Sequence, residues 1–422
     1  MRNSRRVVIT GLGIISPIGI GKDTFWQNLI AGKSGVDYIT AFDFSRSACQ
    51  VAGEVRGFDI SNYMTPKAGK KLSRCSQFSV AAARLALKDS DLTVPFSSGA
   101  DRVGVCFGTS VNGIADIGED NHRTFLTTGV ADLNPLAMLE YPAHAATSHV
   151  ARELSISGPS TTIASGCASG LDTVLWGASE VGRGRIDLAI VGAADAPVTE
   201  FIFSLFCAGG FLATWQGPPS QASRPYDLLR SGLVLAEASA ALILEELEHA
   251  RARGATIYGE VIGMGNSTEG GFDGRIADVY RQSLQAAMAT ALNSAGISPR
   301  QLDHINSHGN STKTDDAAET AAFKSLLGDH AYKVPITSIK GAVGQPLAAG
   351  GILQIAAAVL SITFGCVPPT INQELSDPEC DLDYVPNQSR VARINNVLVH
   401  SHSLGGVVPG SHTAVVIGAP PI

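Results

Sequence analysis

Short runs rich in valine and isoleucine alternate along the chain with longer segments rich in alanine and leucine. The short runs are typical of buried strands and lie at residues 6–10, 103–107, 188–191, 241–244, 258–262, 304–307, 334–337, 397–399 and 413–417. The longer segments carry apolar residues three and four positions apart, which predicts helices at residues 77–88, 171–182, 275–295, 316–327 and 351–364. Because strands and helices alternate, the sequence predicts an α/β protein in which helices cover a buried sheet.

The two ends of the chain resemble each other in this pattern. A glycine-rich strand near residue 10 has a counterpart near residue 262, and the strand that ends near 192 has one that ends near 401. This weak duplication predicts two related halves, residues 1–253 and residues 254–422. No linker rich in serine, proline and glycine separates them, so we expect the halves to pack as one body.

The overall composition excludes several classes of protein. Hydrophobic residues make up 45% of the chain and charged residues 16%, which rules out a disordered chain. The formal net charge of −7 gives no basic excess for nucleic acid or an anionic membrane. The longest apolar stretch, residues 352–367, is too short to span a bilayer. Seven cysteines without a Cys-x-x-Cys pair indicate a reducing compartment, so we expect a cytoplasmic protein.

The most distinctive local feature is a cysteine among small residues directly before a predicted helix. The segment reads Ser165-Gly166-Cys167-Ala168-Ser169-Gly170. Its glycines permit a tight turn, and we expect the helix dipole and free amide donors to lower the pKa of a thiol placed there. Cys167 is therefore a candidate nucleophile. The alternative is a buried structural cysteine, the role that we assign to Cys49, Cys75, Cys106, Cys207 and Cys366.

A second feature is a histidine at the end of a predicted buried strand. His308 is followed by small polar residues, in the order Gly309-Asn310-Ser311-Thr312. A histidine of this kind is often structural. With a candidate nucleophile elsewhere in the chain, His308 becomes a candidate acid, base or oxyanion donor.

Several motifs together resemble the β-ketoacyl-acyl-carrier-protein synthases. They are the setting of Cys167, Ser223-Arg224-Pro225-Tyr226-Asp227, His308-Gly309-Asn310-Ser311-Thr312, Lys340, Val367-Pro368-Pro369-Thr370-Ile371-Asn372 and Asp381-Leu382-Asp383-Tyr384-Val385-Pro386. The resemblance extends from about residue 7 to residue 417 and is to the ketosynthases of type II fatty-acid and aromatic polyketide systems. It implies a thiolase fold, with two equivalent halves in five layers, α-β-α-β-α, and a dimer.

The resemblance also implies the chemistry of the site. Cys167 would accept an acyl chain from the phosphopantetheine arm of an acyl carrier protein, with no further cofactor and no metal. The amides of Cys167 and Leu404 would form an oxyanion hole, and Glu319 and Lys340 would form a supporting ion pair. The substrate and pantetheine pocket would include Asn310 and Thr312.

The sequence departs from the family pattern around this site. Five residues after the lysine the family has a second histidine, which helps to hold the malonyl thioester during loss of carbon dioxide, and this chain has Gln345. Glutamine can donate a hydrogen bond but cannot act as a base near neutrality. In the glycine-rich loop, His402 and Leu404 replace two phenylalanines, and Asn310 replaces a threonine. These changes cluster around one reacting centre and favour altered chemistry.

The leading hypothesis is an acyltransferase of secondary metabolism that works without decarboxylation. Once Cys167 is loaded, His308 or His402 would remove an α-proton, the carbanion would attack an internal carbonyl, and the alkoxide would displace Cys167 as a lactone. This would resemble the ketosynthase-like cyclases of γ-lactam-β-lactone (salinosporamide-type) pathways. A plain acyl transferase fits almost as well.

Two other hypotheses stay open. One is a decarboxylative ketosynthase of a type II polyketide or fatty-acid system, with His402 compensating for Gln345. The other is a non-catalytic chain-length partner in a heterodimer, although such partners usually lack the nucleophile. We expect a homodimer, with pairing to a paralogue as the alternative.

One basic cluster stands out in a chain of acidic net charge. Lys67, Lys70, Lys71 and Arg74 fall within a short segment that begins near residue 65. Such a run is often only a solvated face. In the family that the sequence resembles, this segment faces the acidic carrier protein, so the four residues are candidate docking residues.

Overall fold

The centre of the molecule is one mixed β-sheet. The computed structural model describes residues 5–96, 99–271, 274–403 and 409–421. Within these residues eleven strands form the sheet, in the order β11-β10-β14-β15-β9-β1-β8-β7-β5-β6, with β2 beside β1. The strands are β1 Val7–Ser16, β2 Gly19–Ile20, β5 Val103–Gly108, β6 Ser160–Ile163, β7 Leu188–Asp195, β8 Ala238–Glu246, β9 Gly259–Thr268, β10 His304–Asn306, β11 Ile336–Thr337, β14 Asn396–His402 and β15 Ser411–Gly418.

The strand order repeats itself on the two sides of the β1–β9 junction. On one side β1 is followed by β8, which is antiparallel to it, and by β7, which is antiparallel to β8. Strands β5 and β6 come next and run parallel to β7. On the other side β9 is followed in the same way by β15, β14, β10 and β11. The predicted duplication is therefore confirmed, while the boundary between residues 253 and 254 stays a prediction.

The helices cover both faces of the sheet, and all five predicted helices are present. They are α3 Arg74–Asp89, α7 Ser169–Gly182, α10 Ile276–Ala295, α11 Lys313–Leu327 and α13 Ala349–Phe364. The further helices are α1 Lys22–Ile30, α2 Pro66–Gly69, α4 Ile117–Thr128, α5 Ala137–Glu140, α6 Ala145–Glu153, α8 Glu200–Ala208, α9 Leu247–Ala252 and α12 Lys340–Val343, and two small sheets pair β3 Val36–Tyr38 with β4 Val51–Gly53 and β12 Cys366–Val367 with β13 Arg390–Val391.

The nine predicted strands are confirmed, while β6 and the short strands β2, β3, β4, β12 and β13 were not foreseen. Strand β6 reads Ser-Thr-Thr-Ile and lies at the edge of the sheet, with Ser160 exposed and the other residues half-buried. An edge strand needs no continuous apolar run, so the hydrophobic pattern does not reveal it. It matters for the site because it leads directly to Cys167.

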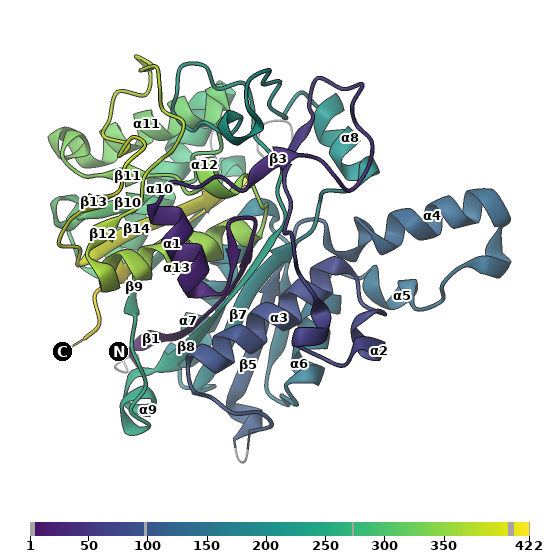
Figure 1. Cartoon of the computed structure of the whole chain (residues 1–422). Helices are drawn as coiled ribbons and strands as arrows, with labels where there is room; N and C mark the ends of the chain where they lie inside the picture. The colour runs from purple at the N-terminus through teal and green to yellow at the C-terminus, as the bar shows by residue number, and fades with distance from the viewer. Residues whose placement is uncertain (1–4, 97–98, 272–273, 404–408, 422) are drawn as a thin grey trace.

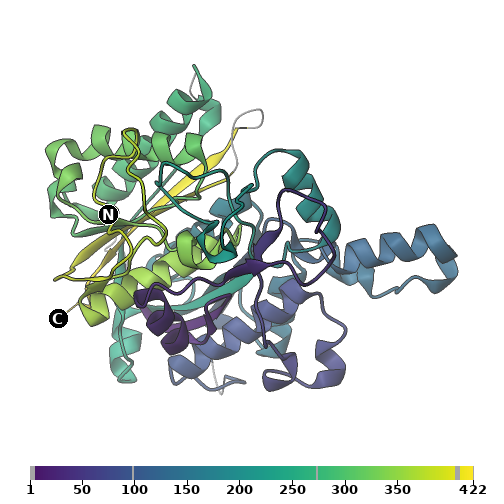
Figure 2. The ribbon, with the colours of Figure 1, turned by 45° about the horizontal axis from the view of Figure 1, so that its top comes forward.

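Two helices form a middle layer that both halves of the sheet share. Helices α7 and α13 contact each other and strands of both halves, and a single apolar cluster unites them with inward residues such as Val191, Leu242, Val399 and Val415. Outside, α3 packs on the β1 half and α10 on the β9 half (Figure 1, Figure 2). These are the five layers of a thiolase fold, as the resemblance implied.

Glycines on the two central strands let the outer helices approach closely. A Cβ atom at Gly13 on β1 would lie 1.9 Å from the carbonyl oxygen of Ala82 in α3, and one at Gly265 on β9 would lie 2.3 Å from that of Ala287 in α10. The neighbouring positions Gly11 and Gly263 are equally confined. The same device therefore occurs at equivalent places in both halves.

Helices α4 and α5 form an arm that projects from the body (Figure 1). The arm exposes large apolar side chains, with Leu126 at 69%, Val130 at 73% and Met138 at 74% of their maximal surface. A patch of this kind on a soluble protein marks a surface that contacts another molecule. In the described residues, no helix combines the length and apolar character needed to cross a bilayer.

We predict that Gly13→Ala and Gly265→Ala each destabilise the protein. The added methyl group would meet helix backbone that cannot move without shifting the whole outer layer, at a cost of about 1–3 kcal/mol. Gly182→Ala at the end of α7 is the matched control, because its Cβ would find only ordinary contacts at 3.6 Å and 3.9 Å. Chemical denaturation measures the free energy of unfolding, and an unchanged value for Gly13→Ala would contradict the close approach.

Candidate active site

A tight turn after β6 places Cys167 at the start of α7. Gly166 has a φ of +66°, and the hydroxyl of Ser169 accepts a hydrogen bond from the amide of Ser165 at 2.9 Å and donates one to the carbonyl of Gly166 at 2.6 Å. The carbonyl of Cys167 accepts a hydrogen bond from Ser401 of β14 at 3.0 Å. The nucleophile candidate is thereby tied to the other half of the molecule.

The thiol of Cys167 is buried in a small cavity. The space between the atoms there amounts to about 210 Å³ but is too narrow to admit a water molecule, and it is lined by Cys167, Phe206, Leu233, His308, Asn310, Gln345, Leu347 and His402. Burial raises the pKa of the Cys167 thiol to about 12, although the charge of Lys340 lowers it. The predicted lowering of this pKa was wrong, because desolvation of the thiolate outweighs the donors at the helix terminus.

His308 lies beside the thiol and is held from several directions. Its Nδ1 lies 3.2 Å from the hydroxyl of Ser401, and its Nε2 lies 3.3 Å from the Nε2 of Gln345. Lys340, the first residue of α12, donates from Nζ to the carbonyl oxygen of His308. Burial lowers the pKa of His308 well below its ordinary value, with His402 and Lys340 adding to the effect. The imidazole is therefore neutral near pH 7.

The predicted ion pair between Glu319 and Lys340 is not formed in the described residues. The carboxylate of Glu319 instead accepts hydrogen bonds from the amide of Gly309 at 3.0 Å and the hydroxyl of Tyr226 at 2.5 Å. Burial raises the pKa of Glu319 to about 8, and it lowers that of Lys340 to about 8. When Glu319 is ionised, its charge raises the pKa of Lys340 against this desolvation, and its hydrogen bonds support the turn that carries His308.

The imidazole rings of His308, His400, His402 and His412 gather behind the cavity. His308 and His402 have ring centres 3.9 Å apart, and His402 and His412, directly opposite each other on β14 and β15, have ring centres 5.4 Å apart. His412 contacts Glu269 at 3.1 Å. Burial lowers the pKa of His400 and of His402 well below the ordinary value. The sequence analysis did not foresee the pairing of His402 with His412 across the hairpin.

Gln345 belongs to the second half of the chain and binds the backbone of the first half beside the cavity. Its backbone donates to the carbonyl of Val234 at 2.7 Å and accepts from Ala236 at 3.0 Å, which fixes the residue just before α13. Its side chain is buried, contacts His308 through Nε2, and leaves Oε1 without a hydrogen-bond partner. The structure thus places Gln345, Cys167 and His308 around one space, as expected.

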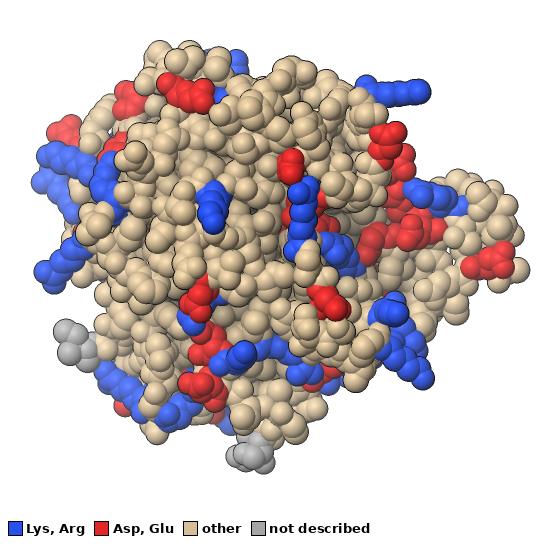
Figure 3. Space-filling model, viewed as in Figure 1, with Lys and Arg blue, Asp and Glu red and all other residues tan. Residues whose placement is uncertain are grey.

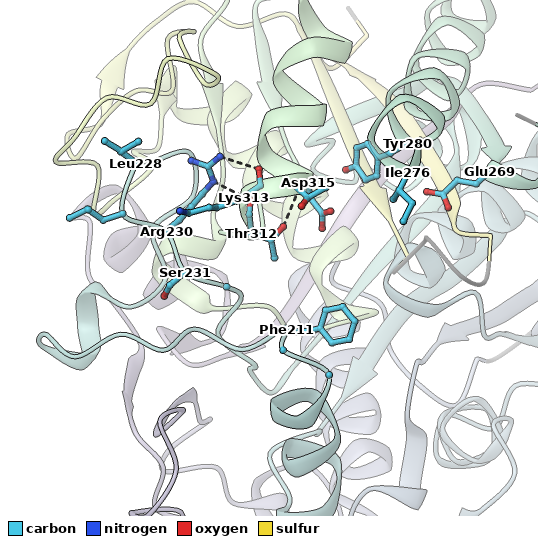
Figure 4. A pocket seen from close by; sticks show the side chains of 15 residues that line it. Phe211, Leu228, Arg230, Ser231, Glu269, Ile276, Tyr280, Thr312, Lys313 and Asp315 are labelled. Atoms are coloured by element: carbon cyan, nitrogen blue, oxygen red, sulfur yellow. Dashed lines mark hydrogen bonds between the residues drawn. The ribbon is translucent and has the colours of Figure 1, made fainter. Parts of the chain in front are cut away.

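A larger pocket opens beside this cavity. It is lined by residues 209–211, 228–232, 312–315, Glu269, Ile276 and Tyr280, and Figure 4 shows Asp315 and Tyr280 on one side with Arg230 and Phe211 around the rest. Arg230 donates to the carbonyl oxygens of Thr312 and Lys313, both at 3.1 Å. Of the two predicted pocket residues, Thr312 lines this pocket and Asn310 lines the nucleophile cavity.

Asn310 and Asp315 connect the two spaces. The amide of Asn310 donates to the carboxylate of Asp315 at 2.7 Å, and its oxygen accepts from the hydroxyl of Thr312 at 2.8 Å. The same carboxylate oxygen of Asp315 lies 3.9 Å from the Nε2 of His402, too far for a hydrogen bond. Leu404, predicted for the oxyanion hole, lies outside the described residues.

The basic cluster divides into two parts. Lys67, Lys70 and Lys71 are exposed on α2 and the turn after it, where basic side chains gather in Figure 3. Arg74 does not belong with them, because its guanidinium binds the carboxylate of Glu237 at 2.7 Å and the carbonyl of Val55 at 2.9 Å. Arg74 is therefore engaged inside the protein.

Asp195 is a buried residue near the site that sequence reasoning missed. Its carboxylate accepts from the hydroxyl of Thr109 at 2.8 Å and from the amides of Val111 and Ala348, both at 3.0 Å. It therefore ties the loop after β5 to the start of α13. Its place at the end of a buried strand was the available signal.

We predict that alkylation of Cys167 by iodoacetamide speeds up about tenfold per pH unit between pH 6 and pH 8. With a thiol pKa of about 12, the thiolate is a minor species that grows in this proportion. Lys340→Met removes a positive charge that favours the thiolate, so it should react more slowly at each pH. Peptide mass spectrometry measures the rate, and a plateau below pH 8 would contradict the buried thiol.

Comparison with known proteins agrees with this geometry. The β-ketoacyl synthase N-terminal domain matches residues 4–250 and the β-ketoacyl synthase C-terminal domain matches residues 258–374. The chain is 39% identical to a 3-oxoacyl-[acyl-carrier-protein] synthase 2 of Coxiella burnetii, over 95% of this chain and 96% of the relative. It is 38% identical to the tetracenomycin polyketide synthase ketoacyl synthase alpha subunit of Streptomyces glaucescens, over 99% and 97%.

Solved structures give the same assignment. The ishigamide ketosynthase/chain length factor superposes with a TM-score of 0.90 at 32% identity, and a type II polyketide ketosynthase in complex with its acyl-carrier protein superposes with a TM-score of 0.89 at 31% identity. Both alignments cover 99% of this chain and 100% of the other. The chain, with its duplicated sheet and its cysteine at the start of α7, belongs to the β-ketoacyl synthase family.

Proposed function

We propose that the protein loads an acyl chain from a carrier protein onto Cys167 and resolves the acyl-enzyme without decarboxylation, by intramolecular cyclisation. The chain belongs to a family of transferases whose substrates arrive on a carrier's phosphopantetheine arm, without a free cofactor. The thiolate of Cys167 would attack the thioester carbonyl and expel the pantetheine thiol. We assign the reaction to the cytoplasm and to secondary metabolism.

The observation that carries this proposal is the contact of Gln345 with His308 at 3.3 Å. In the family pattern a second histidine stands here and helps to hold the malonyl thioester as carbon dioxide leaves. Gln345 occupies the Nε2 of His308 and cannot itself titrate near neutrality. Both features weaken the stabilisation of a malonyl enolate and leave the loading of Cys167 intact.

His402 supplies a base for the alternative reaction. Its Nδ1 lies 2.9 Å from the carbonyl of Ser403, which can only accept, so Nδ1 carries the proton and Nε2 carries a lone pair. That lone pair has no hydrogen-bond partner, and the residue lines the cavity of Cys167. Nε2 would take the α-proton, the carbanion would add to an internal carbonyl, and the alkoxide would attack the thioester. A lactone leaves, and Cys167 departs as thiolate and is reprotonated from His402.

The exposed lysines are consistent with binding of a carrier protein, and the apolar arm is consistent with contact to a second subunit. Lys67, Lys70 and Lys71 would dock the acidic carrier protein, and the pocket lined by Thr312 would receive its pantetheine arm. The apolar side chains of α4 and α5 would contact a second copy in a homodimer. A paralogue in a heterodimer is the alternative, which the ketosynthase/chain length factor among the structural relatives favours.

A decarboxylative condensing enzyme is the second candidate function. The names of the 3-oxoacyl synthase of Coxiella burnetii and the tetracenomycin alpha subunit favour it. The ring centre of His402 lies 3.9 Å from that of His308, so His402 would then take the role of the missing histidine. Malonyl turnover distinguishes the two functions.

We predict that the protein converts malonyl carrier protein to acetyl carrier protein at least about 100-fold more slowly than an ordinary condensing enzyme does, because one well-aimed donor is worth about 100- to 1000-fold. Gln345→His should raise this rate. Intact-mass spectrometry follows the carrier, with Cys167→Ala as the control that cannot be acylated. A rate like that of an ordinary condensing enzyme would return the protein to chain elongation.

We predict that Lys70→Glu together with Lys71→Glu slows acylation of Cys167 from a carrier protein by about tenfold or more, because like charges would then meet across the docking surface. Acylation by an N-acetylcysteamine thioester, which needs no docking, should not change. Lys333→Glu is the matched control, since this lysine is also exposed but follows α11 in the other half. Equal losses with carrier and small thioester would contradict docking at α2.

A further inference from the structure

The hydrogen bonds around His308 fix where its proton lies. Ser401 uses its only proton to donate to the carbonyl of Cys167 at 3.0 Å, so it must accept at the Nδ1 of His308, 3.2 Å away. The proton of the neutral ring therefore sits on Nδ1, and Nε2 carries the lone pair. His308 presents an acceptor toward Gln345.

This tautomer in turn fixes the orientation of the Gln345 amide. The Nε2 of Gln345, 3.3 Å from the Nε2 of His308, must donate to that lone pair, because the opposite orientation would set two acceptors against each other. The oxygen Oε1 then points elsewhere and has no hydrogen-bond partner, although the residue is 98% buried, with a relative exposure of 2%. A buried acceptor without a partner destabilises the protein until a donor reaches it.

Two of the polar side chains that line the cavity of Cys167 have an acceptor atom without a partner, and that of Gln345, Oε1, lies toward Gly350 at the start of α13. Of the side-chain nitrogen and oxygen atoms on the described residues that line the cavity, Gln345 Oε1 and His402 Nε2 lack partners. Asn310 satisfies its amide through Asp315 and Thr312. The remaining lining side chains, Phe206, Leu233 and Leu347, are apolar. With His402 Nε2 assigned to proton removal, Gln345 Oε1 is left to bind the substrate.

We propose that Gln345 selects acyl chains that carry a hydrogen-bond donor, an amide N–H or a hydroxyl, close to the thioester carbonyl. The donor binds Oε1 of Gln345 when the chain is attached to Cys167. This inference rests on the proposed loading of Cys167 and on the proposed role of His402 as the base. It makes Gln345 a specificity-determining residue in addition to the position of a missing histidine.

Pairs of thioesters that differ only in the donor test the proposal. N-acetylglycyl and O-acetylglycolyl N-acetylcysteamine thioesters exchange an N–H for an oxygen, and 3-hydroxybutanoyl and 3-methylbutanoyl thioesters exchange a hydroxyl for a methyl group. Intact-mass spectrometry measures the rate at which each thioester acylates Cys167. Each rate is then divided by the rate at which the same thioester reacts with free N-acetylcysteine, which corrects for its intrinsic reactivity. We expect the donor to speed acylation at least about tenfold in one pair, and the pair that responds distinguishes an amide from a hydroxyl.

Three variants assign the preference to one atom. Gln345→Met removes the acceptor at similar volume and should bring the ratio within a pair close to one. Gln345→Asn keeps an amide with a donor side and an acceptor side and should keep part of the preference. Gln216→Met, at an exposed glutamine, should leave the ratio unchanged. A preference that survives in Gln345→Met would overturn the assignment to Gln345.

The outcomes separate this inference from the proposed function. If all four thioesters acylate the unmodified protein and both ratios are near one, donor selection is wrong and loading of Cys167 stands. If none of them acylates Cys167 while iodoacetamide still labels it, the proposed loading fails and the inference fails with it.

Discussion

The active site depends on the packing of α7 against α13 between the two halves of the sheet. Cys167 lies in the turn directly before α7, and Gln345 lies four residues before α13, so the apolar contact of these helices sets the distance between the candidate nucleophile and the polar groups. His308 and His402 come from strands of the second half that the same core holds. Neither half contains the site alone, and a change in the middle layer would move both sides of the cavity.

Burial gives this site its electrostatic character. Desolvation raises the pKa of Cys167 to about 12, raises that of Glu319 to about 8 and lowers that of Lys340 to about 8. It also keeps His308 and His402 neutral. Near pH 7 the Cys167 thiol and the Glu319 carboxyl group are therefore mostly neutral, because charges so far from water are costly, whereas Lys340 is still mostly protonated at a pKa of about 8. The histidines can therefore offer lone pairs to an incoming substrate instead of repelling one another as cations.

The sequence was sufficient to predict most strands and helices, but it did not predict which side chains contact one another. Val/Ile-rich strands were found because burial on both faces leaves a continuous apolar run, whereas the polar edge strand β6 escaped. Cys167, His308 and Gln345 meet as expected. Arg74 binds Glu237, and Glu319 binds Tyr226 in place of Lys340, since these partners come from distant segments. The pairing of His402 with His412 depends on hairpin register, which spacing alone does not give.

The exchange of a histidine for glutamine changes more than one donor. A histidine can lose or gain a proton during a reaction, whereas an amide keeps one donor side and one acceptor side throughout. At this position the donor side of Gln345 is fixed by the lone pair of His308, so the acceptor side necessarily faces other groups. On the proposed function, this arrangement would disfavour an enolate oxygen, which needs donors, and would favour a substrate group that supplies one. The proposed weak decarboxylation and the proposed substrate preference would then have a common cause, the direction of a single hydrogen bond.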